Sequence, residues 1–475
     1  MPGHKGGLGF SQTVEGKKIY EKIIKCDVTE SDGLDNLHHP EGIIRDAQEL
    51  LRKLYGSSKA YFLVNGSTSG NLAMIFSSFN EGDKIIVERN CHSSIFNGII
   101  MRKLKPIYIK NKINNKYNAP FSIDMEHFLY CVKENKDAKG IIITYPSYYG
   151  VCADLSAIVK EAKKYKMKVL VDSAHGAHFG ISYKLPKSAV ELGADMVVMS
   201  SHKTLPSFTQ TAYLHVMSSN DVEKVDFYVS AFTSTSPSYM LMCSIDYARF
   251  FLETQGKEAY GKLLVVTERY RERINKIKGF HVIGEEDINT RLENINTSID
   301  DIKLKINDIN LKIDGTRYIL NIERGYSGYK LFKYLNNNGL TAEMSDNSNV
   351  ILIFSPFNTE EDFKKLYETL KNCNLKELED KYIDMLAFDL PEVKLLPYEV
   401  MEKGKRRVRL CSSIGCISSS NIIPYPPGIP LIMMGEIIDE YIINMIQYYL
   451  DNQVTVIGTY YRKDIGEYCV DVVEV

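Results

Sequence analysis

The sequence predicts an α/β protein whose largest domain is built on a mainly parallel β-sheet. Between about residues 45 and 250, short apolar runs that end in polar or glycine-containing turns alternate with segments of helical period, which is typical of βαβ units. One such segment, 155–166, carries its apolar residues on one face and lysines elsewhere, which predicts a crossover helix. The predicted strands are 60–64, 84–88, 141–145, 168–172, 194–200 and 211–216. Because ligands bind at the carboxyl ends of such strands, the residues that follow each run are the candidates for a site.

Changes in composition predict four successive segments. Residues 265–276 are rich in charge at helical spacing, and Ile, Asn, Asp and Lys alternate over 285–315, which predicts a separate, smaller domain. A polar, helix-rich zone follows over 359–381, and then PYPPGIP, whose prolines exclude a regular helix or a central strand. The Asn- and Lys-rich piece 110–118 is predicted to be a loop. The predicted division is an N-terminal segment (1–45), the large domain (46–260), a small α+β domain (261–375) and a C-terminal domain (376–475).

The overall composition favours a small-molecule substrate. The 475 residues are 44% hydrophobic and 25% charged, as in ordinary globular proteins. Lys plus Arg (58) nearly balances Asp plus Glu (60), so no excess of one charge predicts nucleic acid or an acidic membrane as a partner. The nine cysteines are scattered without CxxC pairs, and no apolar run resembles a signal peptide or a membrane span. These features predict a cytoplasmic protein with reduced thiols.

A lysine stands at the end of one predicted strand. The segment SSHKTL, with Lys203, directly follows the apolar run 194–199. Placing an ammonium group at the end of a buried strand is unfavourable unless a partner compensates it. Burial lowers the pKa of a lysine and prepares its amine to attack a carbonyl and form an imine. Lys203 is therefore a candidate nucleophile, and the alternative is a lysine that reaches solvent.

A carboxylate follows another predicted strand. In DSAHGAHFG, Asp172 ends the apolar run 168–171. A carboxylate in this position can keep a pyridine nitrogen protonated and so make the ring an electron sink. His175 can hydrogen-bond a phenolate or a substrate oxygen. His175 and His178 also form an HxxH pair, but the strand-end geometry and the lack of a third ligand do not favour a metal site.

Two further segments follow strands. VNGSTSGN carries Ser67, Thr68 and Ser69 between a strand and an apolar stretch. Glycines, hydroxyls and backbone N–H groups at a helix start favour an anion such as phosphate, although the same residues also serve as an ordinary N-cap. The phosphate loop GxxxxGK[ST] is absent from the sequence, so nucleoside triphosphate chemistry is not predicted. His92, in RNCHSS, can stack on an aromatic ring or be a polar surface residue.

Taken together and in this order, these segments resemble the Orn/Lys/Arg decarboxylase family. The resemblance implies the aspartate-aminotransferase-like fold, fold type I of the pyridoxal-phosphate enzymes, for the large domain. It covers most of residues 1–250 and recurs near 425. The matching segments are MPGHKGG, DGLDNLHHPEGIIRDAQEL, VNGSTSGN, RNCHSS, TYPSYYGVCADL, DSAHGAHFG, SSHKTLPSFTQTAYLHV, TSTSPSYMLM and PYPPGIP.

The resemblance also implies the residues of the site. Lys203 is expected to carry pyridoxal 5'-phosphate as a Schiff base, Asp172 to pair with the pyridine nitrogen and His92 to stack on the ring. No metal is expected. The residues 234–236 are expected to reach the cofactor of a neighbouring subunit, in a homodimer or larger homo-oligomer with active sites near the subunit interface. The other implied cofactor-binding residues are His175 beside the ring and, around the phosphate, Ser67, Thr68, Ser69, Ser200 and His202.

The implied reaction is the decarboxylation of a basic amino acid. Arginine, which gives agmatine, is the first choice because the short members that the chain resembles, which lack an N-terminal wing domain, are often arginine decarboxylases. Lysine and ornithine, which give cadaverine and putrescine, remain open. Family members usually carry residues ahead of PGHKGG, whereas Met1 begins it here, so the true start of the chain is an open question. Little of the family pattern is recognisable over 284–349.

Two other functions stay open. A different reaction on the same cofactor, such as transamination, uses the same lysine and aspartate. A protein that binds the cofactor without turnover is disfavoured by the intact set of Lys203, Asp172 and His92. The pocket for the substrate side chain is not evident from the sequence. Its distal cation needs a carboxylate partner, and the candidates in the early segment are equally compatible with solvated surface charges. These candidates are Asp32, Asp35 and Glu41.

Overall fold

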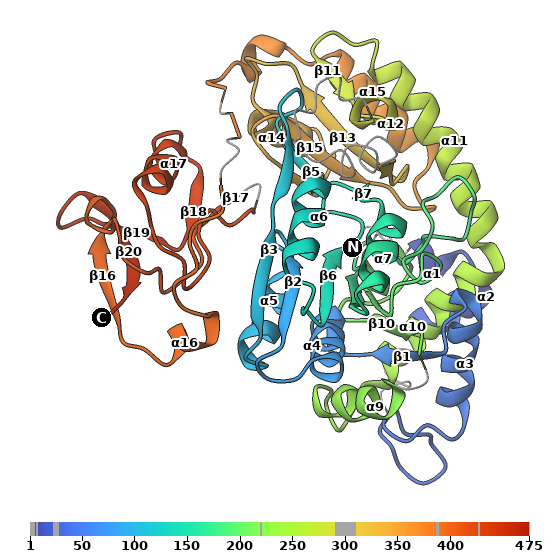
Figure 1. The fold of residues 1–475 in the computed structure, drawn as a ribbon. Coiled ribbons are helices and arrows are strands. Elements are labelled where there is room, and N and C mark those ends of the chain that lie inside the picture. The colour runs from blue at the N-terminus through green and yellow to red at the C-terminus, as the bar shows by residue number, and fades with distance from the viewer. Residues whose placement is uncertain are drawn as a thin grey trace.

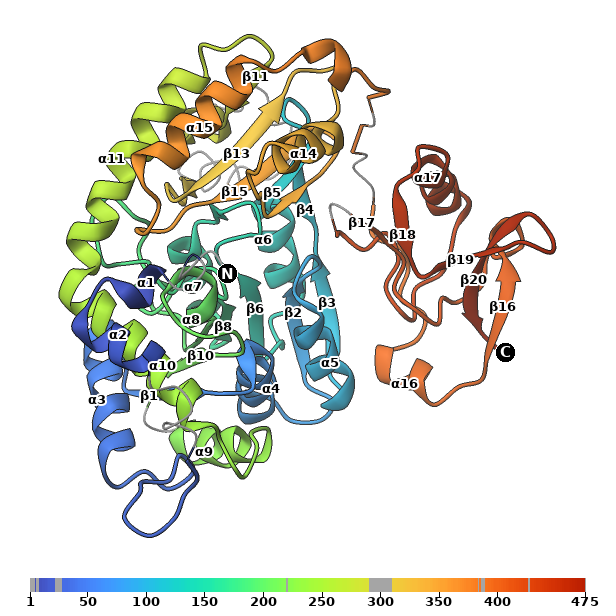
Figure 2. The same cartoon turned by 180° about the vertical axis from the view of Figure 1, so that it is seen from behind.

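The three-dimensional structure is a computed structural model. It describes residues 5, 8–21, 28–218, 221–289, 310–382, 384–385, 389–425 and 428–474. Most of MPGHKGG, residues 290–309 and the two prolines at 426 and 427 lie outside these ranges. Figures 1 and 2 show a large domain around a long sheet, a smaller sheet with its helices at one end, and a C-terminal domain beside the β3 edge. The predicted boundaries between the segments stay predictions.

The large domain is built on a seven-stranded sheet in the order β1-β10-β9-β8-β6-β2-β3. All six predicted runs overlap a strand, and the edge strand β3 was not predicted. Strands β3, β2, β6, β8 and β9 pair in parallel, whereas β10 runs antiparallel to both of its neighbours, β9 and β1. The strands are β1 Lys59–Leu63, β2 Lys84–Glu88, β3 Lys105–Ile109, β6 Gly140–Thr144, β8 Lys168–Asp172, β9 Met196–Met199 and β10 Ala212–Val216.

Helices cover both faces of this sheet (Figure 1). The predicted crossover helix is α7, and the Asp154 side chain caps its start by accepting from the N–H of Ala157. The connection from β9 to β10 holds only the one-turn helix α8, which explains why β10 returns antiparallel. The helices are α1 Leu8–Ser11, α2 Val14–Glu21, α3 Ile43–Tyr55, α4 Gly66–Ser78, α5 Ser93–Met101, α6 Met125–Glu134, α7 Leu155–Lys164, α8 Ser201–Thr204, α9 Val222–Ala231, α10 Tyr239–Phe251 and α11 Lys257–Ile274.

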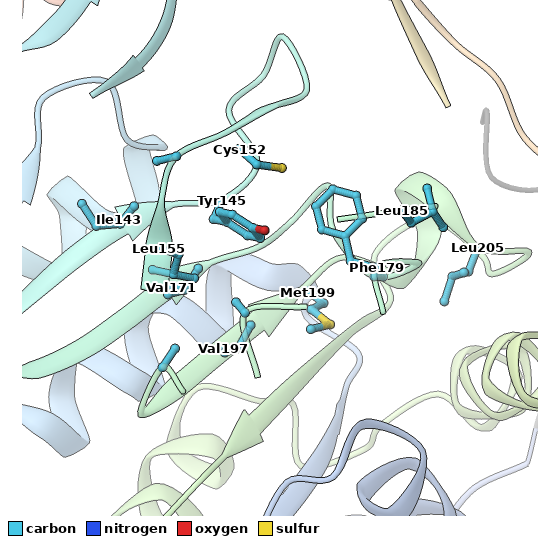
Figure 3. Packing of buried hydrophobic residues seen from close by; sticks show 14 of the residues in the cluster. Ile143, Tyr145, Cys152, Leu155, Val171, Phe179, Leu185, Val197, Met199 and Leu205 are labelled. Carbon is cyan, nitrogen blue, oxygen red and sulfur yellow. The ribbon is translucent and has the colours of Figure 1, made fainter. Parts of the chain in front are cut away.

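The core of the large domain lies on the two faces of the sheet. Successive side chains of a strand point to opposite faces, so Val171 and Val197 pack on one side and Leu170 and Val198 on the other. Figure 3 shows the first side, where Val171, Val197 and Met199 lie beneath residues from the loops that follow the strands. Burial on both faces explains why these strands are continuous apolar runs rather than alternating ones.

The smaller sheet has the order β11-β13-β15-β14 and is antiparallel throughout. A short strand between β11 and β13 in the sequence, β12, pairs with β7 in the loop after β6, so the two domains share backbone hydrogen bonds. The elements are β7 Val151–Cys152, β11 Phe280–Val282, β12 Lys312–Ile313, β13 Arg317–Ile322, β14 Met344–Ser345, β15 Asn349–Ile353, α12 Glu285–Ile288, α14 Gly328–Asn337 and α15 Glu360–Lys371.

The predicted loop 110–118 is wrong in part. Residues Asn111–Asn114 form β4, which pairs antiparallel with β5, Ala119–Ile123. The turn between them holds Asn118 with a φ of 52° and lies beside the smaller sheet, where Asn118 donates to Ser348. Asparagine and lysine disfavour strands, but pairing with the apolar β5 and contact with a second domain override that preference.

The C-terminal domain contains a three-stranded sheet, a two-stranded sheet and one long helix. Pro424 of PYPPGIP lies in β17, which belongs to the two-stranded sheet and so avoids the central position that proline disfavours. Within the described ranges, no helix is both long and apolar enough to span a membrane. The elements are α16 Pro397–Met401, β16 Lys405–Arg409, β17 Ile423–Tyr425, α17 Glu440–Asp451, β18 Thr455–Ile457, β19 Thr459–Arg462 and β20 Glu467–Val473.

Candidate active site

The predicted site residues follow the carboxyl ends of strands at one edge of the large sheet. Six of the seven strands point the same way, so the loops after β1, β2, β8 and β9 meet at that edge. The smaller domain lies over it, because β12 pairs with the loop after β6. The structure therefore brings VNGSTSGN, RNCHSS, DSAHGAHFG and SSHKTL together.

Lys203 lies in α8, immediately after β9, and its amine contacts a neutral imidazole. Its Nζ is 3.2 Å from Nε2 of His175. Burial lowers the pKa of Lys203, and the charges of Asp172 and Glu343 offset part of that effect. Burial and the charge of Lys203 hold the pKa of His175 well below its usual value, so the imidazole is neutral and accepts from Nζ. The proton of His175 then lies on Nδ1, a buried atom without a hydrogen-bond partner in the described parts of the chain.

Asp172 ends β8 and is 2% exposed. Its Oδ1 accepts from the N–H of Ala174 at 3.1 Å, and its Oδ2 accepts from Nδ2 of Asn71 at 2.9 Å. Hydrogen bonds from two neutral donors hold the carboxylate in place without neutralising its charge. A buried anion is therefore available at the edge of the sheet, next to the strand that leads to Lys203.

His92 caps the start of α5. Its Nδ1 accepts from the backbone N–H of Ser94 at 3.2 Å and lies 2.8 Å from the hydroxyl of Ser94. Burial lowers the pKa of His92, an effect that Asp172 opposes and Lys203 reinforces. His92 is thus fixed by the helix that follows it and lies within electrostatic reach of both predicted catalytic residues.

The predicted phosphate site lies at the N-terminus of α4. Ser67 and Thr68 belong to its first turn, and Oγ of Ser200 donates to Oγ of Ser67 at 3.0 Å. Gly66 has a φ of +73°, a conformation that favours glycine, and it makes the turn from β1 into α4. A Cβ on Gly70 would stand 2.6 Å from Leu63, so glycine permits the close packing of α4 on the sheet.

Ser69 and His202, which were also predicted to bind the cofactor, each use one polar atom for a hydrogen bond within the protein. The hydroxyl of Ser69 is turned back into α4, where it donates to the carbonyl of Gly66. Nδ1 of His202 donates to the carbonyl of Thr211 at 2.7 Å, which leaves Nε2 as an acceptor. Sequence reasoning missed two residues of this edge, Asn71 and Ser94. Both lie in segments singled out above, but only their contacts distinguish them from ordinary helix residues.

The HxxH pair is divided between two clusters. His178 does not join His175: its Nε2 is 3.1 Å from Oδ1 of Asp314, and both side chains are fully buried. The other oxygen of Asp314 binds Nε of Arg317 at 3.1 Å, and Arg317 also donates to the carbonyl of Tyr148. In the part of the chain that the structure describes, no group of three or more His, Cys, Asp or Glu residues is arranged to hold a metal ion.

The predicted serines at 234 and 236 and the candidate Asp35 make their hydrogen bonds outside the cluster of Lys203, His175 and Asp172. Ser234 and Ser236 form an exposed turn, and the carbonyl of Ser234 binds Nε2 of His38 at 2.8 Å. Their predicted role in a neighbouring subunit stays a prediction. Both carboxylate oxygens of Asp35 accept backbone N–H groups at the start of α3, so Asp35 stabilises a turn, and its role toward a substrate cation stays a prediction.

The fold defines the class of the protein. Solved structures of the pyridoxal-phosphate enzyme serine palmitoyltransferase match 75–77% of the chain with TM-scores of 0.54–0.56 at 15–16% identity. The lysine decarboxylase LdcF of Francisella novicida matches the whole chain, and 78% of its own chain, with a TM-score of 0.80 at 22% identity. The protein therefore has the fold of type I pyridoxal-phosphate enzymes, as predicted.

The chain belongs to the Orn/Lys/Arg decarboxylase family. The model of the family's major domain matches residues 1–362, and that of its C-terminal domain matches residues 382–473. An uncharacterized protein, YaaO, of Bacillus subtilis is 34% identical over 92% of this chain and 87% of its own. An arginine decarboxylase of the same organism is 31% identical over 96% of this chain and 91% of its own. The predicted family, its decarboxylase activity on a basic amino acid and its cofactor, pyridoxal phosphate, are confirmed.

The residues at the sheet edge fit this cofactor. Several buried polar atoms there have no hydrogen-bond partner among the described residues, and they are Asn71 Oδ1, Ser173 Oγ, His175 Nδ1 and Thr204 Oγ1. Buried polar atoms are normally hydrogen-bonded, so this edge has unused capacity for a polar ligand. An amine of lowered pKa, a buried carboxylate and a helix N-terminus match the aldehyde, ring nitrogen and phosphate of pyridoxal phosphate.

Proposed function

We propose that the protein decarboxylates arginine to agmatine, with Lys203 as the residue that binds pyridoxal phosphate covalently. The contact between Lys203 and neutral His175, next to the buried Asp172, carries the proposal for the site. The relatives named arginine decarboxylase support the substrate, because they are 31–32% identical over 92–96% of the chain. The relatives named lysine decarboxylase are 23% identical over 92% of it, so lysine is the second candidate and ornithine the third.

Each residue has a proposed task. When bound, pyridoxal phosphate supplies an electron sink for the electrons of the bond to the leaving carboxylate. Asp172 supports that sink by holding a proton on the ring nitrogen, and His92 covers the ring. Ser67, Thr68, Ser200 and the N-terminus of α4 bind the phosphate, with Ser69 and His202 shaping that end of the site.

The lysine and its histidine partner control protons at the reacting carbon. Burial lowers the pKa of Lys203, so its amine gives up a proton more readily than an exposed lysine does. His175 accepts from this amine through Nε2, and its buried Nδ1 has no hydrogen-bond partner among the described residues, so we propose that its proton serves an oxygen of the cofactor or the substrate. We propose that Lys203 delivers the proton that replaces the departing CO2.

Glu343 is the proposed partner of the substrate guanidinium. It precedes β14, is exposed, and its Oε1 accepts from the hydroxyl of Tyr148 at 2.9 Å. The ring of Tyr148 stands edge-on to His175, 5.2 Å away, so Glu343 borders the same site. Three other carboxylates near the strand ends are buried and already hydrogen-bonded within the protein. They are Glu88, Asp314 and Asp346.

The proposal includes a homodimer or larger homo-oligomer in the cytoplasm. This part of the proposal follows from the resemblance to the family, which implies active sites near a subunit interface. Sedimentation of the purified protein tests this directly, and a monomer at all concentrations would contradict it.

The deciding experiment is product analysis. Purified protein, supplied with pyridoxal phosphate, is incubated separately with arginine, lysine and ornithine, and both CO2 and the amine formed are measured. We expect agmatine from arginine to be the main product, with none from the Lys203→Ala variant. Cadaverine or putrescine as the main product would move the proposal to the second or third substrate, and a keto acid would indicate transamination instead.

A further inference from the structure

Asn71 lies where three of the site segments meet. It is fully buried in α4, and its Nδ2 is 2.9 Å from Oδ2 of Asp172 and 2.9 Å from Oγ of Ser94. An amide nitrogen has two protons and only donates. Asn71 therefore gives one proton to the carboxylate after β8 and the other to the hydroxyl in the first turn of α5.

The amide of Asn71 can adopt only one orientation. If it were flipped, its oxygen would face the Asp172 carboxylate, and two acceptors in contact in a buried site are unfavourable. Among the residues that the structure describes, the buried oxygen of Asn71 has no hydrogen-bond partner, so the two bonds from Nδ2 set the position of the side chain. The negative charge of Asp172 thus fixes the direction of the hydrogen bonds that follow.

That direction extends to His92. Because Oγ of Ser94 accepts from Asn71, its own proton is available for Nδ1 of His92, 2.8 Å away. The backbone N–H of Ser94 donates to the same nitrogen at 3.2 Å. A ring nitrogen that accepts two hydrogen bonds carries no proton, so the proton of His92 lies on Nε2.

We propose that Asn71 is a positioning residue that orients the Asp172 carboxylate and, through Ser94, keeps His92 neutral with its proton on Nε2. The inference rests on the proposed roles of Asp172 and His92. A second positive charge on His92 would compete with the protonated ring nitrogen for the negative charge of Asp172. A neutral His92 leaves Asp172 with a single positive partner, which strengthens the electron sink.

Nitrogen-15 NMR of histidine-labelled enzyme, with pyridoxal phosphate and without substrate, tests the proposal. The His92→Phe variant assigns the His92 signals by their loss, and one-bond coupling to hydrogen shows which ring nitrogen is protonated. We expect Nε2 to be protonated and Nδ1 not. A proton on Nδ1 in the wild-type enzyme would overturn the proposal before any other variant is made.

Two serine variants separate the hydrogen-bond relay from general packing. Ser94→Ala removes the hydroxyl between Asn71 and His92 and leaves only the longer backbone N–H contact to Nδ1, so we expect part of the neutral His92 to carry its proton on Nδ1. Ser94→Thr keeps a hydroxyl and should keep the wild-type pattern. A mixed pattern in Ser94→Thr, or an unchanged one in Ser94→Ala, would show that the relay does not control the proton.

The link to Asp172 is tested by cofactor affinity. Asn71→Ala removes a hydrogen bond to a charged group, and we expect the dissociation constant of pyridoxal phosphate to rise about tenfold or more. Ser94→Ala leaves the hydrogen bond between Asn71 and Asp172 intact, so it should raise the dissociation constant of pyridoxal phosphate less than Asn71→Ala does. Equal affinities of wild type and Asn71→Ala would contradict the proposal. Because no substrate is present, these results do not depend on which amino acid the enzyme decarboxylates.

Discussion

Two buried polar clusters begin three residues apart, at His175 and His178, and they differ in how their charges are compensated. In the second cluster, Asp314 binds His178 and Arg317 through its two oxygens, and all three side chains are fully buried. In the first, the amine of Lys203 contacts a neutral imidazole instead of a carboxylate. Nδ1 of both histidines lacks a hydrogen-bond partner among the described residues, so the clusters differ in how their charges are paired. A buried charge stabilises a fold when an opposite charge compensates it, and a buried amine of lowered pKa indicates a site.

The largest effect is expected from Lys203→Ala. The variant should lose turnover completely and should form no borohydride-trappable adduct with pyridoxal phosphate, because no other amine occupies its place after β9. Its melting temperature should not fall, since a desolvated amine adds no net stability. Calorimetry and adduct mass spectrometry check both parts. Measurable CO2 release by the variant would refute the role of Lys203.

Asp314→Asn tests the buried cluster of Asp314, His178 and Arg317. It leaves Arg317 buried without its counter-charge, and we expect a loss of about 3–5 kcal/mol of unfolding free energy, measured by denaturant unfolding. As a control, Glu258→Gln removes a fully exposed pair with Lys262 and should leave the unfolding midpoint unchanged. An unaltered unfolding midpoint for Asp314→Asn would contradict the view that this cluster stabilises the fold.

The stabilisation by Asp314 should also depend on pH. Burial alone would raise the pKa of Asp314, but the charge and hydrogen bond of His178 and the charge of Arg317 outweigh burial and lower it. A carboxyl whose pKa is lower in the folded state contributes stability above its unfolded pKa, and that contribution is lost as the pH falls. The difference between wild type and Asp314→Asn should therefore shrink below about pH 4.

Asp172→Ala tests the role of the buried carboxylate in the candidate active site. We expect the chemical step to slow about 100-fold or more, as when one preorganised electrostatic group is removed from an active site. Cofactor should still bind through Lys203 and the phosphate site, with weaker affinity. Single-turnover kinetics with saturating pyridoxal phosphate measures the step. A rate equal to that of the wild type would count against Asp172 as the partner of the ring nitrogen.

The sequence predicted the sheet and the strand-end residues because both follow from local patterns. Strands buried on two faces are continuous apolar runs, and Asp172 and Lys203 stand directly after such runs. The strand Asn111–Asn114 was predicted as a loop because asparagine and lysine disfavour strands. Its pairing with β5 and its contact with the smaller sheet outweigh that local preference.

The partners of the site residues could not be predicted for a different reason. Asn71 and Asp172 are 101 residues apart in sequence, and Tyr148 and Glu343 are 195 apart. Such pairs depend on how the strands are ordered and on where the smaller domain lies, which no local pattern encodes. The contacts of Asp35 are local by contrast, because its two carboxylate oxygens accept backbone N–H groups within nine residues in the sequence.

The smallest of these effects is expected from Glu343→Gln, which tests whether the smaller domain supplies the carboxylate that binds the substrate guanidinium. Loss of a charged hydrogen bond to the guanidinium should raise KM for arginine about tenfold or more, with little change in kcat or in cofactor affinity. Glu361→Gln removes a similarly exposed carboxylate on α15 and should leave KM unchanged. Both glutamates are exposed, so neither variant should alter folding. A KM that does not change in Glu343→Gln, in an enzyme that makes agmatine, would exclude Glu343 and direct the search to a carboxylate of a neighbouring subunit.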